Sequence, residues 1–75
     1  MKNSKTKDLY LAAALIACGE KLICSEKSSN EVWFIFENSE SLNTLKSKHL
    51  TGNLTVNVAQ YQNALRQLKN IIFQT

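Results

Sequence analysis

Two cysteines and one histidine are the residue types in this 75-residue chain best suited to nucleophilic or metal chemistry. Cys18, Cys24 and His49 are too few for a zinc site within one chain. A catalytic cysteine–histidine pair would also need an orienting acid and a pocket, and the spacing brings none of these together. We therefore expect two buried, reduced thiols that pack as small hydrophobic side chains, with no metal and no cofactor. A Cys18–Cys24 disulfide across a helix-to-strand turn stays an alternative.

Sequence motifs for catalysis are missing as well. The chain has no glycine-rich phosphate loop, HExxH, GxSxG or CxxC. Its six carboxylates fall at expected strand ends, helix starts and a turn, where solvated charges normally lie. A chain of this length also has little material for a deep substrate cleft. We expect a non-enzymatic protein with no small-molecule substrate.

Charge is distributed unevenly around a net value of +3. All six acidic residues lie within residues 8–40. The flanking segments are basic: Lys2, Lys5 and Lys7 precede the acidic segment, and residues 41–75 hold four cations and no acid. An acid-free segment rich in amides and cations suits contact with phosphates and base edges.

The run "LYLAAALIACG", Leu9 to Gly19, fits either an export signal or a core helix. "LIAC" resembles a bacterial lipobox, in which Cys18 would be acylated. Asp8 beside the apolar run argues against a signal peptide, and cleavage before Cys18 would remove a helix that a small domain needs. The run is too short to span a bilayer. We expect a core helix with Thr6 as N-cap and Gly19 after its C-terminus, in a cytoplasmic, reducing location.

Alternation of apolar and polar residues predicts a β-hairpin, with strands at residues 21–26 and 31–37 and "KSSN" as its turn. On the second strand Val32, Phe34 and Phe36 share the face expected to pack on helices. Trp33 and Ile35 share the other face. A tail or helix could cover these two side chains, or they could form an apolar interaction surface.

Two further helices follow. Asn38 or Ser39 caps the first, and a "TGN" turn ends it. "LTVN" then forms a third strand or an extended link, and Asn57 opens the last helix. Its apolar stripe is the clearest periodic signal in the chain and comprises Val58, Tyr61, Leu65, Leu68 and Ile72, widened by Ala64, Ile71 and Phe73.

The sequence therefore predicts an α+β fold in the order helix, β-hairpin, helix, short extended segment or strand, helix. Residues 1–5 are expected to form a flexible basic arm, and residues 6–75 one compact domain. Taken together, "TKDLYLAAALIACGEKL", "VWFIFENSESL" and "VNVAQYQNALRQLKNII" resemble a family of unknown function found in short proteins of bacteria and their phages. The resemblance covers residues 6–73. It implies phage or mobile-element origin and an intracellular location, and it implies no activity.

Two functions fit these observations. The first is association with DNA or RNA through the basic C-terminal half; the residues expected to contact it are Lys46, Lys48, Asn63, Arg66, Lys69 and Asn70. The alternative is a protein-interaction module, a homo-oligomer or an adaptor for a host or virion protein, which would use Trp33 and Ile35 as anchors.

Overall fold

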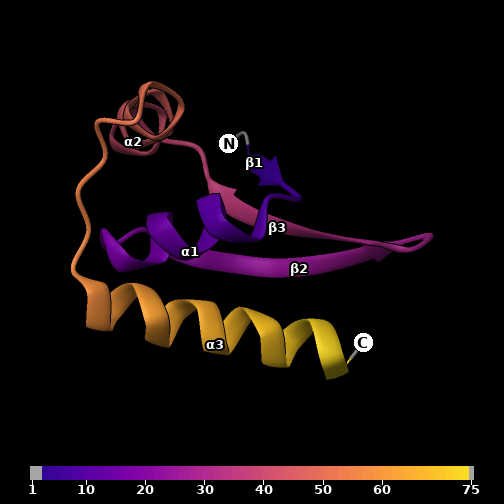
Figure 1. Ribbon diagram of the computed structural model, residues 1–75. Helices are drawn as coiled ribbons and strands as arrows, with labels where there is room; N and C mark the ends of the chain where they lie inside the picture. Colours follow the sequence, from indigo (N-terminus) through magenta and orange to yellow (C-terminus); the bar gives the residue numbers. More distant parts are fainter. Residues whose placement is uncertain (1–2, 75) are drawn as a thin grey trace.

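A three-stranded antiparallel sheet and three helices make up the protein in a computed structural model that describes residues 3–74. The strand order is β1-β3-β2, so the last strand in sequence is central. Figure 1 shows α1 lying across the sheet, with α2 and α3 at opposite ends of the molecule. The predicted α+β class is confirmed. The elements are β1 (Asn3–Thr6), α1 (Leu9–Ala17), β2 (Leu22–Ser28), β3 (Glu31–Glu37), α2 (Glu40–Thr51) and α3 (Val58–Gln74).

The predicted hairpin is present with a tighter turn than expected. Ser28 pairs with Glu31, so the loop between β2 and β3 contains two residues. Ser29 occupies it with a φ of 55°, a left-handed conformation that two-residue hairpin loops require. The first strand therefore runs to Ser28 rather than ending at residue 26. A register shift between Leu22 and Cys24 bulges its start.

The third strand comes from the N-terminus, which differs from the predicted flexible arm. Lys5 lies opposite Ile35 and Thr6 opposite Phe34, so residues 3–6 pair along the free edge of β3. Residues 1–2, which include Lys2 of the predicted arm, lie outside the described part of the chain. "NSKT" has no apolar alternation to mark it as a strand, and only the exposed edge of β3 makes it one. The alternative of a strand at "LTVN" is not realised, since residues 53–57 are irregular.

All three helices contribute to one core on the Phe34 and Phe36 face of the sheet. Four consecutive residues of α1, from Ala12 to Leu15, are at most 3% exposed. Small alanine side chains on both helices let α1 and α3 approach closely. Because α1 is apolar around most of its circumference, it must be covered on several sides. The buried cluster comprises Ala12, Ala13, Leu15, Phe34, Phe36, Leu42, Ala64 and Leu68.

The helix α1 begins two residues later than predicted. Asp8, not Thr6, is its N-cap: the Asp8 carboxylate accepts hydrogen bonds from the backbone N–H groups of Tyr10 at 3.0 Å and Leu11 at 3.2 Å. The Thr6 hydroxyl instead accepts the Asp8 N–H at 3.1 Å. Gly19 follows the helix with a φ of 98°, which confirms the predicted glycine stop.

The other two helices start where the sequence predicts. The Ser39 hydroxyl caps α2 by accepting the N–H of Leu42 at 3.0 Å, and Gly52 ends that helix with a φ of 76°. The side-chain oxygen of Asn57 accepts the N–H of Gln60 at 3.0 Å at the start of α3. Short polar side chains at these positions satisfy backbone N–H groups that have no partner within the helix.

The cap of α1 provides a direct test of this fold. We expect Asp8→Ala to lower the free energy of unfolding by about 1 kcal/mol, because two backbone N–H groups lose their acceptor. Asp8→Asn should retain most of the stability, since asparagine caps equally well. Urea denaturation of the two variants checks this, and equal losses for both would show that the carboxylate charge, rather than the cap, stabilises the helix.

Candidate nucleic-acid interface

The exposed face of α3 combines cations, amides and one aromatic ring. Its residues recur every three or four positions, so they project from the same side of the helix. Leu68 and Ala64 lie on the opposite side, buried against α1. Together with Leu65, which is half-buried and also packs against the core, the exposed residues line a hollow on the surface. We call them the basic face of α3, and they are Gln62, Leu65, Arg66, Lys69, Asn70 and Phe73.

Phe73 belongs to this face and not to the core, which corrects the sequence prediction. Its residue is 83% exposed, whereas Leu68, five positions earlier, is fully buried. Five residues turn a helix by about 140°, so Phe73 cannot share the buried side with Leu68. Val58 is also wrongly predicted as core. It is 68% exposed, at the first residue of α3.

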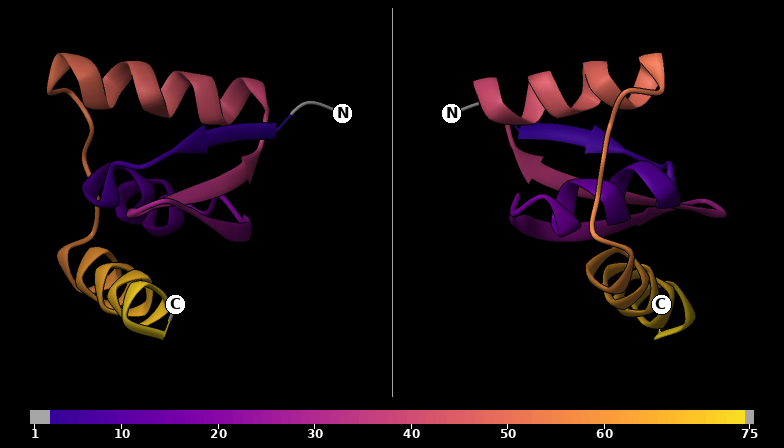
Figure 2. Two further views of the ribbon diagram at one scale, coloured as in Figure 1. Left: turned by 90° about the vertical axis from the view of Figure 1, so that its right-hand side faces the viewer. Right: turned by 60° about the vertical axis from the view of Figure 1, so that its left-hand side comes forward.

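The structure divides the predicted nucleic-acid residues between two places. Arg66, Lys69 and Asn70 lie together on the basic face, and Asn63 is exposed without lining the hollow. Lys46 and Lys48 belong to α2, and Figures 1 and 2 show α1 and the sheet between α2 and α3 in every view. The two groups of cations therefore do not form one surface. The Lys46 ammonium instead donates a hydrogen bond to the Ser4 hydroxyl of β1.

The far face of the sheet is covered by charged side chains of the two outer strands. Ile35 is only 2% exposed, although Figure 2 shows no described helix on that side. The Lys5 ammonium lies 3.7 Å from the Glu26 carboxylate. Since Lys5 is opposite Ile35 and Glu26 is opposite Trp33, this ion pair crosses the central strand between the two apolar side chains.

A second ion pair completes the cover. The Lys7 ammonium lies 3.2 Å from the Glu31 carboxylate and 5.8 Å from the centre of the Trp33 ring. Trp33 is half-buried as a result. Lysine stems cover apolar surface while their ammonium groups stay in water, so the predicted Trp33/Ile35 surface is not an open apolar patch.

The sulfur and imidazole groups stay apart. Both cysteines are free; Cys18 is half-buried, and Cys24 is exposed, contrary to the prediction of two buried thiols. Cys24 lies on the edge strand β2, where the start of the strand is bulged. His49 lines a mostly apolar hollow with Leu54, Val56 and Tyr61, and the lining contains neither cysteine nor carboxylate. Within residues 3–74 no three metal-ligating side chains gather.

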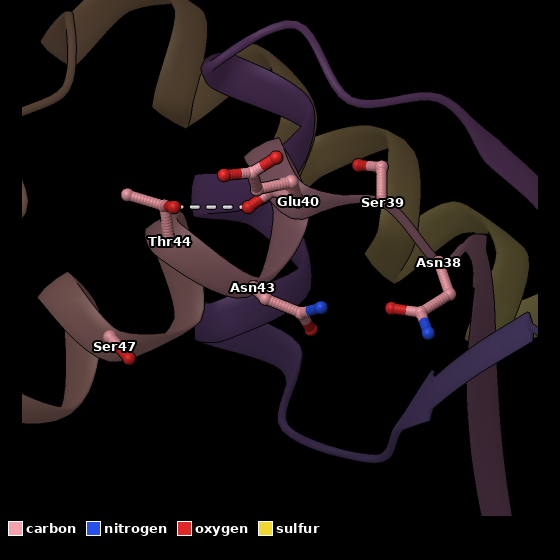
Figure 3. Close-up of a pocket in the computed structure, with 6 residues that line it drawn as sticks. All are labelled: Asn38, Ser39, Glu40, Asn43, Thr44 and Ser47. Carbon is pink, nitrogen blue, oxygen red and sulfur yellow. Dashed lines mark hydrogen bonds between the residues drawn. The ribbon is translucent and has the colours of Figure 1, made fainter.

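A polar hollow at the start of α2 is lined by side chains that cap or stabilise this helix (Figure 3). The Thr44 hydroxyl donates a hydrogen bond to the Glu40 carbonyl at 3.0 Å, and Ser39 is the helix cap. The amides of Asn38 and Asn43 point toward each other across the opening. The Ser39 hydroxyl also donates a hydrogen bond to the Glu20 carboxylate at 3.4 Å, so the polar groups of this hollow hold the start of α2 against the segment that follows α1.

Comparison with known proteins gives a family but no relative of known activity. Residues 1–74 match the model of the domain of unknown function DUF5659. The chain belongs to this family. The match confirms the resemblance to a family of unknown function noted in the sequence. No curated protein and no solved structure matches the chain.

Among the described residues of this DUF5659 domain, no helix is both long and apolar enough to cross a membrane. The apolar run that resembled an export signal forms α1, which spans Leu9–Ala17 and lies at the centre of the core.

Tyr61 is the titratable group most affected by the packing of α3 on α1. Burial raises the pKa of its phenol above the ordinary value of 10.0, and the negative charges of Tyr10 and Asp8 add to the rise. The folded protein therefore holds this proton more tightly than the unfolded chain. As pH rises through the unfolded pKa, the unfolded chain releases the proton first and is thereby stabilised relative to the folded state.

This linkage predicts a specific alkaline instability. The free energy of unfolding of the wild type should fall faster than that of Tyr61→Phe between about pH 9 and pH 11, because phenylalanine has no proton to release. Urea denaturation across this range checks the difference. Parallel curves for the two proteins would show that Tyr61 is not held protonated by the fold.

Proposed function

We propose that the protein is a small, non-enzymatic accessory protein that associates with nucleic acid through the basic face of α3. The observation that carries the proposal is the grouping of Arg66 and Lys69 with two amides and an exposed aromatic ring on one helix face. No acidic residue occurs in α3 or anywhere after residue 40. Guanidinium and ammonium groups bind phosphate oxygens, and amides can contact base edges.

The positions of the other charges also favour this face. Lys5 and Lys7 pair with Glu26 and Glu31 on the sheet, so those cations are matched by anions. A solvated helix usually alternates cations with anions to form ion pairs along its surface. Because α3 has cations alone, its field attracts polyanions.

The size of the face limits the strength of binding. Two cations would neutralise about two phosphates, which gives a slope of log K against log salt of about −2 on duplex DNA. Affinity should be on the order of micromolar to a hundred micromolar and should be highest at low salt. Together with the sequence resemblance, this function suits an intracellular protein of a bacterium or its phage.

The alternative, a protein-interaction module built on Trp33 and Ile35, receives less support. Ile35 is nearly inaccessible, and a partner would first have to displace the Lys5–Glu26 and Lys7–Glu31 ion pairs. Exposed ion pairs contribute at most about 1 kcal/mol, so their displacement is feasible. Apolar side chains beneath them would then be the anchors.

Charge reversal on α3 tests the proposal. Arg66→Glu with Lys69→Glu should abolish binding to nucleic acid at low salt, because both phosphate contacts become repulsive. The control is Lys21→Glu with Lys27→Glu, which changes the net charge equally at exposed positions that lie outside α3 and outside the predicted contacts. Fluorescence anisotropy with labelled oligonucleotides measures both. Equal losses would mean that net charge, and not the basic face, governs binding.

A further inference from the structure

We infer that the basic face of α3 is a single-strand binding site in which Phe73 stacks on an unpaired base. This inference rests on the proposed function and specifies the form of nucleic acid that the site accepts. It is carried by the place of Phe73, an aromatic ring that the fold leaves in solvent among the cations that would hold a phosphate backbone.

The exposure of Phe73 has no explanation in the core. Its residue is 83% exposed, whereas its neighbours Ile71 and Ile72 are partly buried and pack against the buried cluster. Isolated apolar side chains on a surface are normal and carry no meaning by themselves. Phe73, however, lines the same hollow as Arg66, Lys69 and Asn70. An aromatic ring beside phosphate-binding cations is the combination that single-strand binding proteins use.

The spacing along α3 suits a short piece of one strand. Arg66 and Phe73 are two helical turns apart, or about 11 Å along the axis. Nucleotides in one strand of a duplex repeat every ~3.4 Å, so this length matches about three stacked nucleotides. Lys69 lies between the ends of this interval. One phosphate could therefore meet Arg66 or Lys69 while a neighbouring base reaches Phe73.

A duplex fits the same face less well. Its bases are stacked on one another and paired, so they present edges and no free ring face to Phe73. A duplex would also gain from cations that reach its second strand. The other two predicted cationic contacts, Lys46 and Lys48, belong to α2 at the opposite end of the molecule. The amides of Gln62 and Asn70 remain available to the edges of an unpaired base.

The test compares labelled oligothymidylate, oligouridylate and a mixed-sequence duplex of equal length by fluorescence anisotropy at low salt. We expect the protein to bind the single strands more tightly than the duplex. Phe73→Ala should weaken single-strand binding by about 5- to 150-fold, the range for loss of one stacked base. Phe73→Trp should retain it, since tryptophan also presents a ring face. The DNA and RNA strands together show whether the sugar matters.

Leu50→Ala is the matched control, because Leu50 is an equally exposed apolar side chain, at 84%, on α2. It should leave binding unchanged. Neither Phe73 nor Leu50 belongs to the buried cluster, so both variants should keep the urea midpoint of the wild type, which is measured in parallel. A drop in the midpoint of Phe73→Ala would assign the ring to stability and overturn the inference.

The outcomes separate the two levels of the proposal. Duplex binding as tight as single-strand binding, or single-strand binding that is indifferent to Phe73→Ala, overturns the stacking site. The proposed function stands in that case if Arg66→Glu with Lys69→Glu still abolishes binding. Absence of binding to all three oligonucleotides at low salt overturns the proposed function and the stacking site together.

Discussion

The packing of a nine-residue, alanine-rich helix against two phenylalanines is the contact on which the rest of this structure depends. Ala12, Ala13 and Leu15 of α1 meet Phe34 and Phe36 of the central strand, and α2 and α3 add one and two side chains to the same cluster. Full burial of each phenylalanine contributes about 1.5–3 kcal/mol. A chain this short has no second core, so α1 cannot be removed without exposing both rings.

This arrangement places the helices on one face of the sheet. The other face is covered by ion pairs between side chains of the strands and of Lys7. The far side of β3 is covered by side chains of its two neighbours, where Lys5 reaches Glu26 across Ile35 and Lys7 lies near Trp33. Each ion pair is worth little by itself. Together they hold lysine stems over apolar atoms and pair Lys5 and Lys7 with carboxylates. In α3, by contrast, Arg66 and Lys69 have no acidic residue in the same helix.

Much of the candidate interface could be predicted from the sequence, because an acid-free, amide-rich helix face is visible as a one-dimensional pattern. Arg66, Lys69 and Asn70 were identified this way. Phe73 was missed, although a rotation of 100° per residue would have placed it opposite Leu68. Its apolar character suggested the core. Lys46 and Lys48 were grouped with α3 because they share its composition, and no local pattern records that α1 lies between α2 and α3.

The sequence by itself determined the local events: the hairpin, the Ser39 and Asn57 caps, the glycine stops and the helix periods. These follow from steric limits and hydrogen bonds within a few residues. Only the tertiary structure decided that "NSKT" is a strand, that Ile35 is buried and that the cations divide between two sites. A strand edge, an ion pair across a sheet and the side on which a helix docks all depend on partners distant in sequence, and that geometry is set when the whole core closes.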